Sequence, residues 1–260
     1  MPRFAANVSF LWPTIADPYE RFALAAAAGF DAVELTFVHD LDIGAVAALL
    51  RRHELELVLF DPYPGDWAGG ERGVLCLPGR GDEARWSIRR AVDDAARTGT
   101  KRLNVLAGIP DPDREHRVAL HTAARRLKGE APYAADRGIE LLVENINPID
   151  MPGYLIERVS DAAELVALVD EPNVRLQFDA YHVAMVGEDP VVEFGRYASL
   201  VSHIQIADVP GRHQPGTGIV DWRSFLKTVD GAGYAGAVAL EYHPRGSMDE
   251  ALAWLVDYRL

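Results

Sequence analysis

The chain has 260 residues, of which 49% are hydrophobic and 25% charged, and its formal net charge is −13 with a pI near 5.0. This length can bury a full core and is typical of one α/β barrel of roughly 250 residues. The acidic balance argues against a nucleic-acid partner, because phosphate backbones are repelled. The single cysteine, Cys76, excludes an intrachain disulfide and favours a reducing compartment.

No apolar run approaches the ~18 residues of a membrane span, and the first residues lack the apolar core of a signal peptide. We therefore predict a cytoplasmic protein that binds neither a membrane nor nucleic acid. The sequence is compatible with a homo-oligomer.

Eight short apolar runs alternate with amphipathic stretches, and several are almost wholly apolar, as parallel strands buried on both faces should be. The predicted strands are Arg3–Ser9, Ala32–Phe37, Leu55–Asp61, Arg102–Ala107, Ile139–Glu144, Val174–Asp179, Ser202–Ala207 and Ala237–Tyr242. Without a break in composition, these units predict a single-domain α/β fold, the (β/α)8 TIM barrel, over residues 1–260. An open doubly wound sheet is the alternative, but no glycine-rich phosphate loop follows the first strand.

Two features of the connecting segments are informative. Between the first two strands, Asp17-Pro18 predicts a helix start with Asp17 as N-cap, and Gly29 stands where a C-terminal glycine is expected. The longest stretch without periodicity covers residues 62–81, after the third strand. Long barrel loops are commonly functional, so we predict a lid-like loop there.

Polar side chains end the last four predicted strands: Glu144, Asp179, Gln205 and Glu241. In a parallel barrel the carboxyl ends of the strands meet at one rim, where the active sites of this fold lie. Any one of these residues alone could be a strand-end cap or an ion-pair partner. Four at equivalent places on consecutive strands indicate a common site.

Strand alternation gives these four side chains a direction. If they point into the barrel mouth, the layer below them consists of Leu142, Gln177, His203 and Ala239. The residues that then face the helices are apolar, namely Val143, Phe178, Ile204, Ile206 and Leu240. A register shifted by one residue would bury four polar side chains against helices, which is costly.

Three carboxylates in a low-dielectric mouth repel one another, so at least one would stay protonated without a counter-charge. A divalent cation removes this conflict. Because Glu144, Asp179, Gln205 and Glu241 all offer oxygen atoms and none is histidine, the set favours Mg²⁺ or Mn²⁺ over zinc. The sequence therefore predicts one divalent metal cofactor in a site that remains slightly negative.

Longer motifs carry a resemblance to a known family. The specific ones are Gly65-Asp66-Trp67-Ala68-Gly69-Gly70-Glu71-Arg72-Gly73 in the predicted lid and His203-Ile204-Gln205-Ile206-Ala207-Asp208 along the seventh strand. Others are Glu144-Asn145-Ile146-Asn147, Asp179-Ala180-Tyr181-His182 and Pro215-Gly216-Thr217-Gly218. Nearly end to end, the chain resembles the hydroxypyruvate isomerase family of the xylose isomerase-like TIM-barrel superfamily.

The resemblance implies that Glu144, Asp179, Gln205 and Glu241 hold the metal, and that Glu144 and Glu241 serve as proton donor and acceptor. It also implies the conversion of hydroxypyruvate to tartronate semialdehyde by proton transfer through an enediolate. The metal would polarise the carbonyl. A metal-assisted hydride shift is a second mechanism that the residues leave open. Many relatives in the wider superfamily carry His where Gln205 stands, so Gln favours this branch over the sugar epimerases.

The substrate would bring its own carboxylate to a site that is already negative, so cationic groups must bind it. Arg212, shortly after the seventh strand, is the first candidate because a guanidinium can hold a carboxylate with two hydrogen bonds. Arg72 in the lid is the second. His182 is a candidate for binding a substrate hydroxyl, and Trp67 for closing over the substrate.

Other functions remain open at this point. A 2-oxo-tetronate isomerase or a ketose 3-epimerase would use the same metal site, and a non-catalytic sugar-acid-binding protein would need no paired bases. A Schiff-base aldolase needs a lysine at a strand end, but Lys101, Lys128 and Lys227 fall elsewhere. A nuclease of similar fold would need several His ligands and a basic face, and the sequence provides neither.

Overall fold

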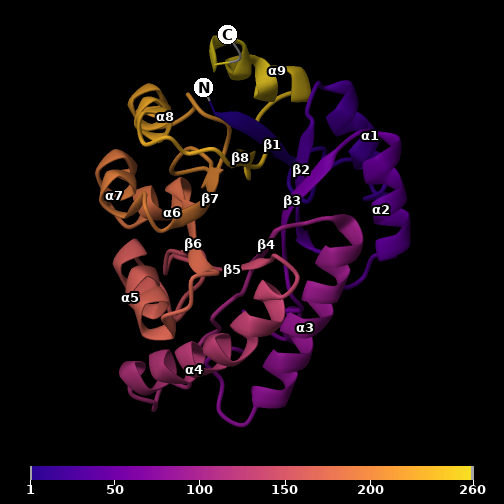
Figure 1. Ribbon diagram of the computed structural model, residues 1–260. Helices are drawn as coiled ribbons and strands as arrows, with labels where there is room; N and C mark the ends of the chain where they lie inside the picture. The colour runs from indigo at the N-terminus through magenta and orange to yellow at the C-terminus, as the bar shows by residue number, and fades with distance from the viewer. Residues whose placement is uncertain (1, 259–260) are drawn as a thin grey trace.

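Eight parallel strands close into a barrel in the order in which they occur along the chain (Figure 1). The computed structural model describes residues 2–258. The strands are β1 (Arg3–Asn7), β2 (Ala32–Phe37), β3 (Glu56–Asp61), β4 (Arg102–Asn104), β5 (Glu140–Glu144), β6 (Val174–Asp179), β7 (Val201–Ile206) and β8 (Ala237–Leu240). The predicted (β/α)8 fold is confirmed.

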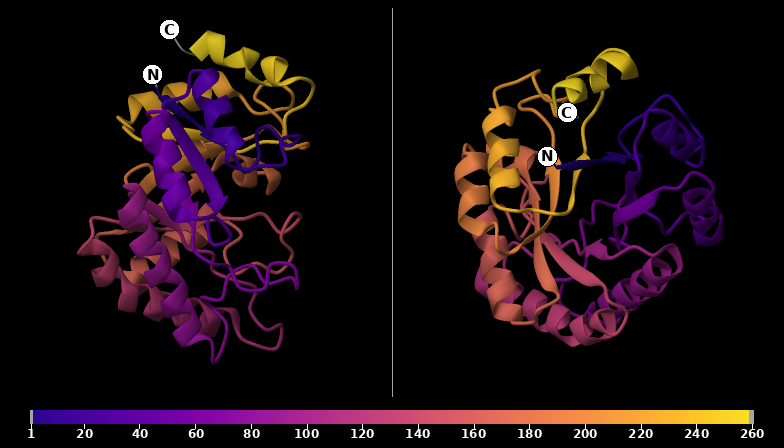
Figure 2. Two further views of the ribbon diagram at one scale, coloured as in Figure 1. Left: turned by 90° about the vertical axis from the view of Figure 1, so that its right-hand side faces the viewer. Right: turned by 45° about the horizontal axis from the view of Figure 1, so that its top comes forward.

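Helices form a ring outside the barrel, which Figure 1 and the right-hand view of Figure 2 show nearly end-on. They are α1 (Glu20–Ala27), α2 (Ile43–Arg52), α3 (Gly81–Thr98), α4 (His116–Ala135), α5 (Val159–Val169), α6 (Ala180–Met185), α7 (Pro190–Tyr197), α8 (Trp222–Gly231) and α9 (Met248–Leu252), followed by the 3-10 helix η1 (Ala253–Tyr258). Within the described part of the chain, no helix combines the length and the apolar character that crossing a bilayer requires.

The predicted alternation along the strands is confirmed. Leu142 and Ala239 belong to a small apolar cluster of strand residues, largely alanines, valine and leucines, that is separate from the main core. The residues predicted to face the helices belong to the main core together with helix residues; they are Val143, Phe178, Ile204, Ile206 and Leu240. Parallel strands covered by helices bury both faces, which explains why these runs are so apolar.

Some strands and helices begin or end at other residues than predicted, because local hydrogen bonds replace the regular backbone pattern there. β4 ends at Asn104 rather than at Ala107, because the carbonyl of Ala107 accepts from Cys76 of the long loop instead. The predicted helix start at Asp17 is wrong, since α1 begins at Glu20. The Asp17 side chain instead caps the turn just before α1, because it accepts from the Tyr19 amide at 2.9 Å. Gly29 does follow the helix end, in the left-handed region with φ 84°.

The long loop between β3 and α3, residues 62–80, is anchored at both ends. Residues 73–76 are buried, and Gly73 fits so closely against Leu106 that an added Cβ would lie 2.2 Å from the Leu106 carbonyl oxygen. Arg80 ion-pairs with Glu71 within the loop and with Glu83 of α3. The longest stretch at the surface is the tip, residues 66–72, in which 66–70 are exposed and 71–72 are partly exposed. Any lid motion therefore belongs to this tip.

Candidate active site

The four predicted rim residues meet at the carboxyl ends of β5 to β8. Glu144 and Asp179 are the last residues of their strands, and Glu241 directly follows β8. Asp179 pairs in register with Gln205 of β7. All four side chains are buried. The barrel thus brings residues that are up to 97 positions apart to one rim, as strand ends in this fold do.

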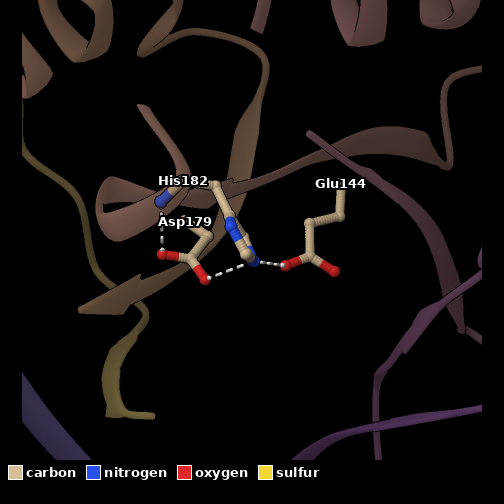
Figure 3. A group of neighbouring side chains, drawn as sticks. All are labelled: Glu144, Asp179 and His182. Atoms are coloured by element: carbon tan, nitrogen blue, oxygen red, sulfur yellow. Dashed lines mark hydrogen bonds and ion pairs between the residues drawn. The ribbon is translucent and has the colours of Figure 1, made fainter. Parts of the chain in front are cut away.

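Glu144, Asp179 and His182 form a compact cluster (Figure 3). One ligand atom from each lies within 4.8 Å of the other two. The Nε2 atom of His182 is 3.5 Å from Asp179 Oδ2 and 3.9 Å from Glu144 Oε1. Figure 3 shows the imidazole of His182 between the two carboxylates, with its Nε2 atom facing both.

Asn147 fixes the tautomer of His182. The Asn147 Oδ1 atom accepts from the amides of Ile149 and Asp150 at 3.0 and 2.9 Å, so its Nδ2 group faces the ring at 2.6 Å from Nδ1. Since an amide nitrogen only donates, Nδ1 is the acceptor and the neutral ring carries its proton on Nε2. Burial and the charge of Arg212 hold the pKa of His182 well below its usual value, which keeps the ring neutral. His182 is therefore a hydrogen-bond donor toward the site.

Arg212 supplies the positive charge at the rim. Its Nη2 atom hydrogen-bonds Glu241 and lies 3.6 Å from Asp179 Oδ2. The guanidinium also stacks between the rings of Phe10 and Tyr181, with its Cζ atom 4.9 Å from each centroid. Burial alone would lower the pKa of Arg212, but the neighbouring carboxylates raise it overall, so the group stays charged. The structure places Arg212, the first candidate for binding the substrate carboxylate, beside Asp179 and Glu241.

Asp208 shapes the loop that carries Arg212. Its Oδ2 atom accepts from the amides of Gly216 and Gly218, both at 2.9 Å, and its Oδ1 atom from Val220 at 3.2 Å. A Cβ at Gly218 would lie 1.9 Å from the Val209 carbonyl oxygen, so only glycine fits there. The glycine pair thus wraps a buried carboxylate and positions the loop.

Burial raises the pKa of each rim carboxyl. For Glu144 the pKa lies well above its usual value, because burial is reinforced by the charges of Glu241 and Asp179. Burial raises the pKa of Asp179 to about 6 and that of Glu241 to about 8, although Arg212 opposes both shifts. Without a further cation, these groups cannot all be ionised near neutral pH.

The residues fit a hard divalent cation. The Asp179 Oδ2 atom is buried and accepts no hydrogen bond from the described residues, so one carboxylate oxygen remains available. Glu144 and Glu241 supply further oxygens, and burial together with neighbouring carboxylates raises the pKa of both groups despite Arg212. Buried carboxylate and amide oxygens are the donors that Mg²⁺ and Mn²⁺ prefer.

The hydrogen bonds of the Gln205 side chain go to residues below the rim. Its Nε2 group donates to Glu34 Oε1 at 2.8 Å, and its Oε1 atom accepts from Gln177 Nε2 at 2.6 Å. A carbonyl oxygen has two acceptor positions, so Oε1 retains one beside the Gln177 bond.

Four polar residues of the first four strands were missed in the sequence prediction: Asn7, Glu34, Asp61 and Asn104. Asn7 donates to Glu34 at 2.7 Å and to Glu241 at 3.2 Å. Asn104 donates to Glu144 at 2.7 Å. Burial and the charges of Glu144 and Glu241 raise the pKa of Asp61 well above its usual value. Of these, Asp61 stands at the end of a predicted strand, whereas Asn7 and Asn104 fall inside predicted strands that the structure ends at these two residues.

The two lid candidates lie at the exposed tip of the loop. Arg72 stacks on the Trp67 ring, with Cζ 4.0 Å from the centroid, and donates to the Trp67 carbonyl at 3.0 Å. Trp67 also packs edge-on against Phe37 of β2, with centroids 5.0 Å apart. The structure therefore joins Arg72 and Trp67 to each other and to the end of β2.

The comparisons with known proteins agree with this geometry. The family model for the xylose isomerase-like TIM barrel matches residues 22–258. The chain belongs to this family. A 2-oxo-tetronate isomerase from Cupriavidus necator is 39% identical over 258 residues, or 99% of each chain. The hydroxypyruvate isomerase of Escherichia coli is 34% identical over 259 residues, or 100% of each chain. The predicted family and its isomerase class are confirmed.

Solved structures show the same barrel. A Brucella melitensis protein described as an AP endonuclease of family 2 is 38% identical, with a TM-score of 0.96 and full coverage of both chains. The 3-keto-D-glucoside 4-epimerase of Escherichia coli is 21% identical, with a TM-score of 0.79 over 99% of each chain. At that identity, the second likeness concerns the fold alone.

Proposed function

We propose that this chain is a metal-dependent isomerase of a small 2-oxo hydroxy acid, with hydroxypyruvate and tartronate semialdehyde as its substrate pair. The observation that carries the proposal is the buried group of Glu144, Asp179 and Glu241 beside Arg212 at the barrel rim. The names of the similar isomerases from Cupriavidus necator and Escherichia coli support a small hydroxy-keto acid as the substrate class.

The metal ligands in this proposal are Glu144, Asp179, Gln205 and Glu241. His182 is not included, because the proton on its Nε2 atom occupies the lone pair that a metal would need. When bound, Mg²⁺ or Mn²⁺ supplies Lewis-acid polarisation of the substrate carbonyl. In this proposal Arg212 leaves the Glu241 oxygen that it now contacts when the metal is bound.

Glu144 and Glu241 are the proposed proton donor and acceptor. With hydroxypyruvate, the base removes a proton from C3 and the acid returns a proton to C2. The hydroxyl hydrogen on C3 passes to the oxygen on C2, so the product is tartronate semialdehyde and no redox partner is needed. Burial raises the pKa of both carboxyls, that of Glu241 to about 8, and a pKa near the working pH makes proton exchange efficient.

The substrate carboxylate is bound by Arg212 in this account. Its guanidinium is fixed between two aromatic rings and faces the rim, so little side-chain freedom is lost on binding. The Nε2–H group of His182 donates a hydrogen bond to a substrate oxygen. Trp67 and Arg72 at the loop tip are the proposed cover over the site.

A four-carbon 2-oxo-tetronate is the second candidate substrate. The observation that favours it is the 39% identity to the Cupriavidus necator enzyme, against 34% to the Escherichia coli hydroxypyruvate isomerase. The proton chemistry on the two acids is the same. The two acids differ in size, so the space above the rim decides which of them fits.

A substrate panel tests the proposal. Hydroxypyruvate, 2-oxo-tetronates and neutral ketoses are assayed after exhaustive chelation with EDTA, with and without added Mg²⁺ or Mn²⁺. We expect turnover of one of the acids that chelation abolishes and metal restores. Full activity after chelation would refute the metal site, whereas turnover of ketoses alone would refute the acid substrate.

A further inference from the structure

Glu34 is a completely buried carboxylate in the middle of β2, next to the proposed ligands but not among them. It is 0% exposed. An isolated charge is very costly inside a protein, so a buried carboxylate must be held by hydrogen-bond donors. The partners of Glu34 therefore indicate why it is there.

Three side chains from two other strands converge on the two oxygens of Glu34. Its Oε1 atom accepts from Asn7 Nδ2 at 2.7 Å and from Gln205 Nε2 at 2.8 Å. Its Oε2 atom is bonded to His203 Nε2. The arrangement joins β1, β2 and β7 below the rim.

The orientation of the Gln205 amide follows from these contacts. Because Glu34 presents an acceptor, the amide group of Gln205 must turn its nitrogen toward Glu34 and its oxygen away. The oxygen then accepts from Gln177 at 2.6 Å and keeps one acceptor position. The reverse orientation would place two acceptor oxygens 2.8 Å apart.

We propose that Glu34 is a positioning residue for Gln205: it binds the amide nitrogen so that the amide oxygen is presented as a metal ligand. The inference rests on the proposed metal site. Buried carboxylates that hydrogen-bond metal ligands orient them, and their loss typically weakens metal binding 10- to 100-fold. Asn7 extends the effect, because the same Nδ2 group that contacts Glu34 lies 3.2 Å from Glu241.

The test is Mn²⁺ binding by the full-length, chelator-treated protein, measured by isothermal titration calorimetry. Glu34→Leu removes both acceptor oxygens and is expected to weaken Mn²⁺ binding ~10- to 100-fold. Glu34→Gln removes the charge but keeps an oxygen that can accept from Asn7 and Gln205, so it should retain most of the affinity. Glu130→Gln is the control, because Glu130 is also a buried carboxylate but pairs with Arg85 and Arg89 on the helix ring.

The two Glu34 variants separate positioning from simple attraction of the cation. Wild-type affinity in Glu34→Leu would overturn the inference, as would an equal loss in Glu34→Leu and Glu34→Gln, which would indicate a charge effect. A wild-type protein that binds no Mn²⁺ would refute the metal site itself, and the inference with it. Circular dichroism establishes that each variant is folded.

Gln205→Glu tests the same contact without altering Glu34, should Glu34→Leu fail to fold. A carboxylate at position 205 would face the Glu34 oxygen at 2.8 Å, so it should weaken Mn²⁺ binding although it adds a negative ligand. Combining it with Glu34→Gln should restore binding. Tighter binding by Gln205→Glu alone would overturn the inference.

Discussion

The guanidinium of Arg212 contacts the carboxylate of Glu241 at the barrel rim, and this contact occupies an oxygen that the proposed function requires for a metal. Arg212 also lies 3.6 Å from Asp179, so one cation serves two carboxylates. A dication would take over this neutralisation. The freed guanidinium could then bind the carboxylate of the substrate, which links metal binding to substrate recognition.

Replacing Arg212 by Leu should therefore impair substrate binding more than the proton transfer itself. Loss of a charge-assisted contact to a carboxylate costs about 1.5–3 kcal/mol, so KM for the acid substrate should rise roughly 10- to 100-fold. Steady-state kinetics measure this. Arg137→Leu, just after α4, where the arginine stacks on Tyr133, is the control. A KM unchanged from wild type would exclude Arg212 as the carboxylate-binding group.

Glu144→Gln and Glu241→Gln should each lower kcat by at least ~10², since each removes a group that exchanges a proton with substrate. Glu130→Gln should leave kcat unaltered, because Glu130 pairs with arginines on the helix ring. Rates are compared at saturating Mg²⁺ or Mn²⁺. Near-wild-type turnover in either variant would remove that carboxyl from its catalytic role.

The tautomer of His182 gives a third prediction. Asn147→Asp would place an acceptor 2.6 Å from Nδ1, so the ring proton would move to Nδ1 and Nε2 would no longer donate toward the site. A catalytic histidine in the wrong tautomer can lose orders of magnitude in rate, so we expect kcat to fall ~10² or more. Unchanged kcat would mean that Nε2 does not need its proton.

A large part of the fold follows from the sequence, because parallel strands inside a helix ring are apolar on both faces. The runs ending in Glu144 and Asp179 could be recognised as strands that end in a carboxylate, and both strand ends are correct. The barrel then brings such ends together without further information.

Other parts of the site could not be predicted, because they depend on contacts between distant residues. Glu34 lies inside its strand, and its partner His203 is 169 positions away. The orientation of Arg212 depends on a loop wrapped around Asp208, in which Arg212 itself has a φ of 51°. Hydrophobic periodicity contains no information about either contact.

The raised carboxyl pKa values predict that metal stabilises the protein more at higher pH. A carboxyl whose pKa is raised on folding contributes stability below its unfolded pKa, and this contribution is lost as pH rises through the folded pKa. For Glu241 this window runs from about 4.5 to about 8. The metal-free protein should thus lose stability across it, and protons should compete with metal at its acid end.

Thermal unfolding with and without Mn²⁺ measures this effect. The increase in Tm caused by a fixed Mn²⁺ concentration should be larger near pH 8 than near pH 5.5. Glu241→Gln, which cannot ionise at this position, should show a smaller difference between the two pH values. An equal or larger increase at the acid pH would contradict the assignment of the rim carboxyls as ligands.

The position of the metal is the central claim, and anomalous X-ray scattering from crystals grown with Mn²⁺ tests it most directly. The account predicts one strong peak at the rim, within ~2.0–2.6 Å of oxygens from Glu144, Asp179, Gln205 and Glu241, with Arg212 displaced from Glu241. A peak bonded to the Nε2 atom of His182, or the absence of any peak among these four side chains, would contradict it.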